Sequence, residues 1–131
     1  MDFEEKIVYV ISGSCGVGKS TIGKGVKTIK TLLTRNSLNI SDIYMMIPQN
    51  INHQGYVNLY AKMLNLNPEK LFLENIPKGG HLGDVDIMRN FKDFSINNTI
   101  PEEANILLYG LGGPEGKDKS YDAVLVKYSP K

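Results

Sequence analysis

Short apolar runs of the kind found in buried strands alternate along this chain with longer segments of helical period. Each run is short and has residues typical of turns at both ends, a pattern that predicts a strand. The five predicted strands cover residues 7–11, 43–47, 71–73, 105–109 and 122–126. Strands that alternate with helices favour an α/β fold of three layers, in which a mainly parallel, five-stranded sheet has helices on both faces. The last two strands, which only a loop joins, are expected to pair antiparallel.

Three segments between these strands have apolar residues on one helical face. They extend from about residue 20 to 36, from 54 to 65, and around residues 87–94. The methionine and aromatic residues of the later helices, including Met63 and Met88, are expected to lie in the core. The charged stretch at residues 114–120 is expected to be a mobile loop.

The size of the chain favours one domain over residues 1–131. With 131 residues and 41% hydrophobic content, it can form one ordinary core. Cys15 is the only cysteine, which excludes an internal disulfide, and the two histidines lack metal-ligand spacing, so we expect no metal site. The net charge of +1 argues against nucleic-acid binding. The acidic amino terminus and the absence of a long apolar run predict a cytoplasmic protein without a membrane segment.

The charges are unevenly distributed. Residues 6–41 contain six cationic side chains and no acidic one, so this third of the chain carries +6. Two interpretations remain open. The lysines form a solvated helix face, or they form a docking surface for a phosphorylated or acidic partner.

A glycine-rich string follows the first predicted strand. Residues 13–20, GSCGVGKS, match the phosphate-loop pattern GxxxxGK[ST] between a strand and a helix, and the candidate loop covers residues 13–21. In this interpretation the backbone at Gly13 and Gly18 surrounds a phosphate, Lys19 neutralises it and Ser20 binds Mg²⁺, so the ligand is ATP with magnesium. The alternative is a tight turn in a chain with 13 glycines. Few later strands end in the acid that a phosphotransferase needs, which weakens the first interpretation.

Polar residues also follow the second and third predicted strands, in the stretches IPQNIN and ENIPKGGHLGDVD. The carboxyl ends of parallel strands are where α/β sheets place their binding and catalytic groups. Asn50, Asn52 and Asp84 are alternatively helix caps.

The stretch from about residue 28 to 126 resembles the carboxyl-terminal half of a β-ketoacyl-acyl-carrier-protein synthase III-like enzyme of the thiolase superfamily. The blocks SLNISDIYMMIPQNIN, AKMLNLNPEKLFLENIPKGGHLGDVD and TIPEEANILLYGLGG carry the resemblance. It implies a domain like one half of a thiolase-type subunit. It also places Gln49 where the family has its catalytic histidine and His81 where it has its catalytic asparagine, with Asp84 or Asp86 orienting His81. Gln49 is able to donate a hydrogen bond to a thioester carbonyl but cannot transfer a proton near neutral pH.

The resemblance further implies that the acylated cysteine belongs to an amino-terminal half and that Cys15 is not its equivalent. The first hypothesis is therefore a component or fragment of an acyl-thioester condensing or acyl-transfer enzyme. Its substrate would be a coenzyme A or phosphopantetheine thioester, with acyl carrier protein as a partner and no tightly bound cofactor. The assembly would be a homodimer or a complex with an amino-terminal-half partner that carries the cysteine. The alternatives are a non-catalytic assembly subunit of the same fold and a small P-loop ATP-binding protein or kinase.

Overall fold

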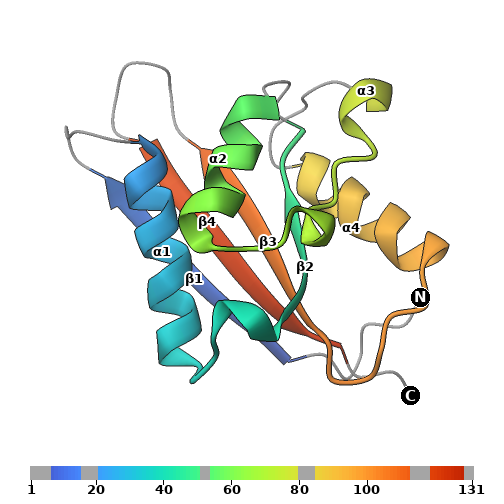
Figure 1. Ribbon diagram of the computed structural model, residues 1–131, viewed down its shortest axis with the longest axis horizontal. Coiled ribbons are helices and arrows are strands. Elements are labelled where there is room, and N and C mark those ends of the chain that lie inside the picture. Colours follow the sequence, from blue (N-terminus) through green and yellow to red (C-terminus); the bar gives the residue numbers. More distant parts are fainter. Residues whose placement is uncertain (1–6, 16–20, 51–53, 80–84, 113–118, 129–131) are drawn as a thin grey trace.

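The computed structural model describes residues 7–15, 21–50, 54–79, 85–112 and 119–128. Four strands, four α-helices and two short 3₁₀ helices lie in this part of the chain (Figure 1). In order they are β1 (Ile7–Cys15), α1 (Thr21–Arg35), η1 (Ile40–Asp42), β2 (Ile43–Pro48), α2 (Gln54–Leu64), η2 (Pro68–Lys70), α3 (Ile76–Gly79), α4 (Val85–Asn97), β3 (Asn105–Gly112) and β4 (Lys119–Lys127).

The four strands form one mixed sheet in the order β1-β4-β3-β2. β4 pairs antiparallel with both β1 and β3, whereas β3 and β2 pair in parallel. The antiparallel pairing of the last two strands is therefore confirmed. The prediction of a mainly parallel sheet is wrong, because β4 lies between β1 and β3 and runs against both.

The prediction of a fifth strand at residues 71–73 is also wrong. Leu71 forms an isolated parallel bridge with Met46, and the Phe72 N–H donates to the Met46 carbonyl at 2.9 Å. η2 ends immediately before Leu71, and the turn that leads into α3 follows within a few residues. The extended stretch is therefore too short for a ladder, although it lies against β2.

Strands β1 and β4 are longer than the apolar runs that predicted them. β1 continues through Gly13 to Cys15, where its partners are Tyr121 and Lys119 of β4. The first three residues of the glycine-rich string are thus strand rather than loop. At this same end of the pairing, Lys119 and Ser120 belong to β4, so the prediction of a loop is wrong for these two residues. Residues 114–118 of that predicted loop lie outside the described residues.

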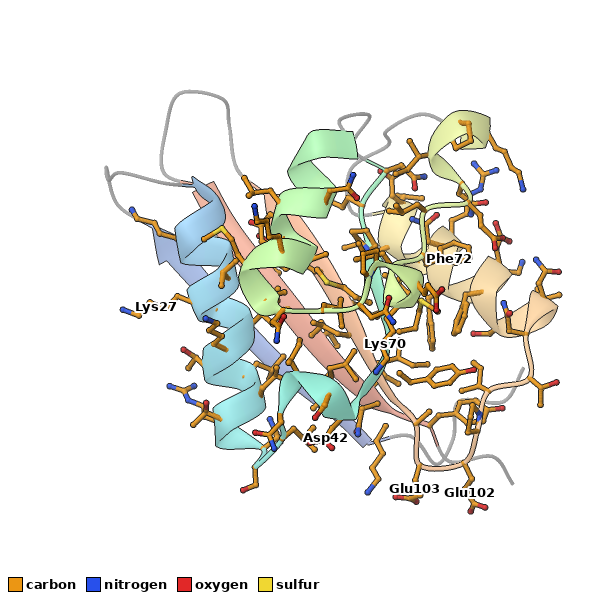
Figure 2. The ribbon with its side chains drawn as sticks, in the orientation of Figure 1. Lys27, Asp42, Lys70, Phe72, Glu102 and Glu103 are labelled. Atoms are coloured by element: carbon orange, nitrogen blue, oxygen red, sulfur yellow. The ribbon has the colours of Figure 1, made fainter. Side chains whose placement is uncertain are left out.

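Helices cover both faces of the sheet, which confirms the α/β fold with three layers (Figure 1). α1 and α2 lie side by side on one face, and α4 lies on the other face against β2 and β3. Successive residues of β3 alternate between the two cores: Leu107 and Tyr109 face α1 and α2, whereas Ile106 and Leu108 face α4. The second core also contains Phe91, Phe94 and Phe72, of which Phe72 is labelled in Figure 2.

Where burial is described, the helices bury most of the apolar residues that their periodicity placed on an inner face, but Leu59, Met63 and Met88 are exposed. Val26, Ile29, Leu32 and Leu33 of α1 are buried, as are Phe91 and Phe94 of α4. Met88, however, is 62% exposed, and Leu59 and Met63 are 40% and 42% exposed, so the prediction that the methionines lie in the core is wrong for these helices. Among the described residues, no other layer covers these three side chains.

Candidate functional site

β2 ends at the residues that the sequence singled out. Pro48 is its last residue, and Gln49 and Asn50 follow it with only 2% of each exposed. Burial of a primary amide is costly unless hydrogen bonds satisfy it, so neighbouring groups must pair with these side chains. The end of β2 is therefore a polar region enclosed within the fold.

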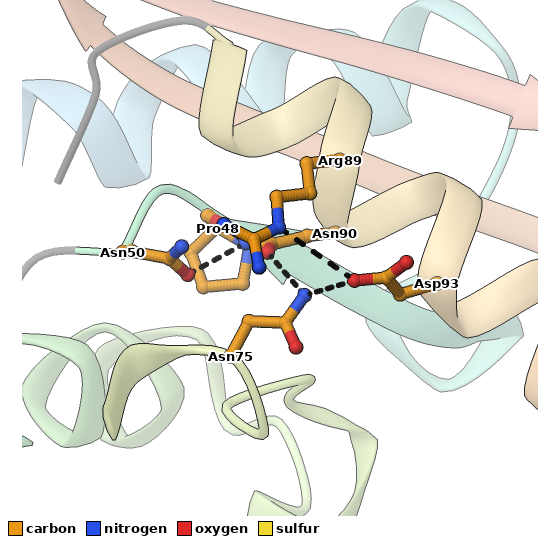
Figure 3. A network of polar contacts seen from close by, with 6 residues as sticks. All are labelled: Pro48, Asn50, Asn75, Arg89, Asn90 and Asp93. Atoms are coloured by element: carbon orange, nitrogen blue, oxygen red, sulfur yellow. Dashed lines mark hydrogen bonds and ion pairs between the residues drawn. The ribbon is translucent and has the colours of Figure 1, made fainter. Parts of the chain in front are cut away.

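Asn90 of α4 connects this strand end to the helix (Figure 3). Its Nδ2 donates to the Pro48 carbonyl at 3.0 Å and to Asn50 Oδ1 at 2.8 Å. Asn90 is 1% exposed, so both bonds lie in a region of low dielectric, where losing a partner is expensive. The amide of Asn90 thus holds the backbone carbonyl before Gln49 and the side chain of the residue after it.

Asn75 extends the same network toward α3. Its Nδ2 donates to Asn90 Oδ1 at 3.0 Å and to Asp93 Oδ2 at 2.7 Å. Arg89 Nε lies 3.9 Å from the same carboxylate oxygen, one helical turn from Asp93. We refer to Asn50, Asn75 and Asn90 as the asparagine hub. Together they connect three parts of the fold: the end of β2, helix α4, and the segment that precedes α3.

Asp86 supplies the carboxylate of the site. It lies in the first turn of α4, where the helix dipole favours a negative charge, and it is 1% exposed. Its Oδ2 accepts a hydrogen bond from the Asn50 N–H at 3.2 Å. The carboxylate therefore fixes the backbone directly after Gln49.

Gly110 of β3 leaves space for the Gln49 side chain. A Cβ at position 110 would lie 3.3 Å from Gln49 Nε2 and 2.7 Å from Ile87 Cδ1. A larger residue would displace one of these groups. The amide of Gln49 is thus confined between β3 and α4, which limits its rotation.

Of the residues predicted for the site, the fold brings Gln49 and Asp86 into one buried region. His81, Gly18, Lys19 and Ser20 lie outside the described residues. Gly13 lies in β1, paired with β4. Nucleotide binding by the glycine-rich string therefore remains a prediction.

Three residues of this region escaped the sequence analysis: Asn75, Asn90 and Gly110. For Asn90 the sequence held a signal, because Asn90 lies three residues after Ile87 and four before Phe94, on the buried face of α4. A polar residue on an apolar helical face suggests a buried partner. Nothing local identifies that partner, which is 42 residues away at Pro48.

The region offers amide donors and a carboxylate, and it is suited to hold a polar group by hydrogen bonds. Within the described ranges, no group of three or more histidine, cysteine, aspartate or glutamate side chains is placed to bind a metal ion. In the same part of the chain, no helix is both long and apolar enough to cross a bilayer.

The sequence matches no protein-family model and no curated protein. Its fold, by contrast, is similar to that of 3-oxoacyl-[acyl-carrier-protein] synthase III from Aquifex aeolicus, with a TM-score of 0.72 and 21% identity over 82% of this chain and 33% of that one. The synthase III from Pseudomonas aeruginosa gives a TM-score of 0.71 and 17% identity over 99% of this chain and 47% of that one. The chain thus spans about a third of the first structure and just under a half of the second. At these identities the likeness shows the fold, and the chain folds as a part of a synthase III subunit does.

Proposed function

We propose that this chain is a component of an acyl-thioester condensing or acyl-transfer enzyme, similar to 3-oxoacyl-acyl-carrier-protein synthase III, and that it works with a partner bearing the nucleophilic cysteine. One observation carries the proposal. In a fold similar to that of synthase III, the end of β2 holds the confined amide of Gln49 beside the first turn of α4. The sequence resemblance, which implies that Gln49 occupies the position of the family's catalytic histidine, gives this amide its proposed role.

The proposed role of Gln49 follows from its chemistry. Its Nε2 would donate a hydrogen bond to the carbonyl oxygen of a coenzyme A or phosphopantetheine thioester, and so stabilise the negative charge that develops there. Because an amide transfers no proton near neutral pH, His81 would supply any acid or base, oriented by Asp86. The substrate would reach the site on coenzyme A or on acyl carrier protein, without a tightly bound cofactor.

Ligand-dependent melting tests this function. Acetyl-coenzyme A at millimolar concentration is expected to raise the melting temperature by about 3 °C. Gln49→Glu keeps the shape of the side chain but removes its donor, so it should abolish most of that rise relative to its own baseline. Thr34→Ala, at an exposed position of α1, is the matched control. A rise with Mg·ATP that Lys19→Ala abolishes, and none with acetyl-coenzyme A, would instead establish the nucleotide-binding alternative.

A labelling experiment tests the assignment of the nucleophile. When the protein is incubated with radiolabelled acetyl-coenzyme A, Cys15 should remain unlabelled, because the resemblance places the acylated cysteine on a partner. Stable acylation of Cys15 would contradict that assignment.

The outer face of α4 supports the need for a partner. Val85, Met88 and Ile96 are 62%, 62% and 65% exposed, and helical spacing places them on one face together with Lys92. Large apolar side chains grouped on a surface are typical of protein interfaces. A second copy of the chain or an amino-terminal-half partner would cover them.

We expect the chain alone to self-associate through this face and to sediment as a dimer or a larger species. Met88→Glu places a charge in the apolar surface and should shift the protein toward the monomer. Lys78→Glu, which reverses an exposed charge on α3 rather than on this face, is the control for charge alone. A wild-type chain that sediments as a monomer at all concentrations would contradict self-association.

A second candidate is a non-catalytic assembly subunit with the same fold. The asparagine hub favours it, since Asn50, Asn75 and Asn90 use their amides to join structural elements. Self-association through α4 combined with no response to acetyl-coenzyme A would select this alternative.

A further inference from the structure

β4 has one acidic residue, and it lies at the end of the sheet where β2 and β3 finish. Asp122 is paired with Gly110 of β3 on one side and with Ser12 of β1 on the other. Residues directly opposite each other in an antiparallel ladder lie on the same face of the sheet. Asp122 therefore shares the face of α4 with Val124 and Val126 of its own strand.

Gly110 connects Asp122 to the candidate site. A Cβ at position 110 would lie 3.3 Å from Gln49 Nε2. Opposed Cβ atoms in an antiparallel pair are about 5 Å apart, so the same point would lie roughly that far from the Cβ of Asp122. Because glycine has no side chain, nothing attached to position 110 separates the two groups. The amide of Gln49 and the carboxylate of Asp122 are thus neighbours across Gly110.

The charged residues of the four strands are unevenly divided between the two faces. The lysines of β4, Lys119 and Lys127, are an odd number of positions from Asp122 and therefore lie on the opposite face. Of the strand residues on the α4 face, Asp122 alone is charged. Asp86, at the start of α4, adds a second carboxylate to the same region. Both acidic groups would repel an anionic ligand.

We propose that Asp122 is a specificity-determining residue, which restricts the site to acyl thioesters whose acyl group carries no carboxylate. The inference rests on the proposed function, in which Gln49 Nε2 donates to the thioester carbonyl. Asp122 is only partly buried, because α4 lies against β2 and β3 and leaves β4 beside it. A carboxylate next to the bound carbonyl would approach Asp122 across Gly110, and like charges in a partly buried site repel each other strongly.

This selectivity distinguishes between the two reactions of the proposed function. Condensation driven by decarboxylation needs a carboxylate on the carbon next to the thioester carbonyl, since that group leaves as carbon dioxide. Asp122 would repel such a substrate. In acyl transfer, the carbon–sulfur bond of the thioester breaks, a bond to an oxygen or nitrogen of the acceptor forms, and the acceptor's proton passes to the released thiol. Asp122 therefore favours transfer of an uncharged acyl group.

Calorimetric titration of the full chain with two thioesters tests the proposal. Propionyl-coenzyme A and malonyl-coenzyme A share the coenzyme, and they differ in that a carboxylate replaces the terminal methyl group. The wild-type chain should bind propionyl-coenzyme A about tenfold more tightly, or more. Asp122→Asn keeps the size of the side chain and removes its charge, so it should reduce this preference to about twofold or less. Asp122→Ala should change the preference in the same direction.

Glu102→Gln is the matched control. It removes one negative charge from an exposed position just before the start of β3, whereas Asp122 is opposite a residue near the end of that strand (Figure 2). This control should leave the preference unchanged. A purely structural role for Asp122 would change the affinity for both thioesters alike in Asp122→Asn, and a preference that stays at the wild-type value would overturn the proposal.

The side-chain amide resonances of Gln49 give a measurement without ligand. They should shift in Asp122→Asn but not in Glu102→Gln, and no shift in either variant would overturn the placement of Asp122 beside Gln49. The titrations separate this inference from the proposed function. Equal affinity of the wild-type chain for both thioesters would overturn the specificity role and leave the proposed function standing. Binding of neither thioester would overturn the proposed function itself, and this inference with it.

Discussion

Replacing Gly25 by alanine is expected to lower the free energy of unfolding by about 3 kcal/mol, although alanine is the better helix former by about 1 kcal/mol. A Cβ at position 25 would lie 2.1 Å from the hydroxyl oxygens of both Tyr60 and Tyr109. These hydroxyls form a hydrogen bond with each other in the core, beneath α1. The added methyl group would separate α1 from α2 and β3 or break that bond, and either change exceeds the gain in helix propensity.

Urea unfolding of Gly25→Ala measures this cost, and a second variant identifies its source. In the Gly25→Ala background, Tyr60→Phe together with Tyr109→Phe removes both clashing oxygens. We expect this change to recover about 2 kcal/mol, although the same pair of substitutions should destabilise the wild-type chain. A Gly25→Ala protein as stable as the wild type would show that α1 moves freely over the tyrosine pair.

Replacing Asn90 by alanine is expected to cost about 3 kcal/mol, because it leaves the buried acceptors at Pro48 and Asn50 without the donor that satisfies them. Asn75 would also lose one of its two acceptors on α4. The rings of the second core pack elsewhere on α4, so the helix should remain in place while the end of β2 loosens. The substitution should therefore lower the free energy of unfolding and also change the structure locally, at the end of β2.

Two measurements separate these effects. Urea unfolding gives the loss of stability, and Asn98→Ala is the matched control. Asn98 is exposed just after the end of α4, and its side chain donates to the Phe94 carbonyl of that helix rather than to a distant segment of the described chain. That control should cost about 0.5 kcal/mol. The side-chain amide resonances of Gln49 report on its confinement, and they should shift in Asn90→Ala but not in Asn98→Ala. Unchanged Gln49 resonances would contradict a positioning role for Asn90.

The end of β2 shows which residues of the candidate site can be predicted from the sequence and which cannot. Gln49 and Asp86 were predicted from a resemblance together with the rule that strand ends hold polar groups, and the fold places both in one buried region. Asn90 was missed because its partners are a backbone carbonyl and an amide about 40 positions away. The helical periodicity places Asn90 on the buried face of α4, but it does not identify the residues that this face contacts.

The strands of the sheet were also predicted only in part from the sequence. Apolar runs located the strands that form the ladder, since a buried strand needs apolar side chains wherever it lies. The run at residues 71–73 has the same composition, yet it contributes only one bridge to the sheet. The residues on either side of this run form turns, so the extended segment is too short to pair as a strand. A prediction based on one run at a time does not include that constraint.

By itself, the sequence determined the four strands of the sheet, the three long helices α1, α2 and α4, and the covering of both faces by helices. Period and composition are local properties of the chain, and they suffice for these features. The tertiary structure alone decided that β4 inserts between β1 and β3, that Asn90 joins α4 to the end of β2, and that Met88 faces outward. These outcomes depend on which surfaces meet when distant segments pack. Pairing partners and burial are fixed by the free energy of the whole fold, and no single segment encodes them.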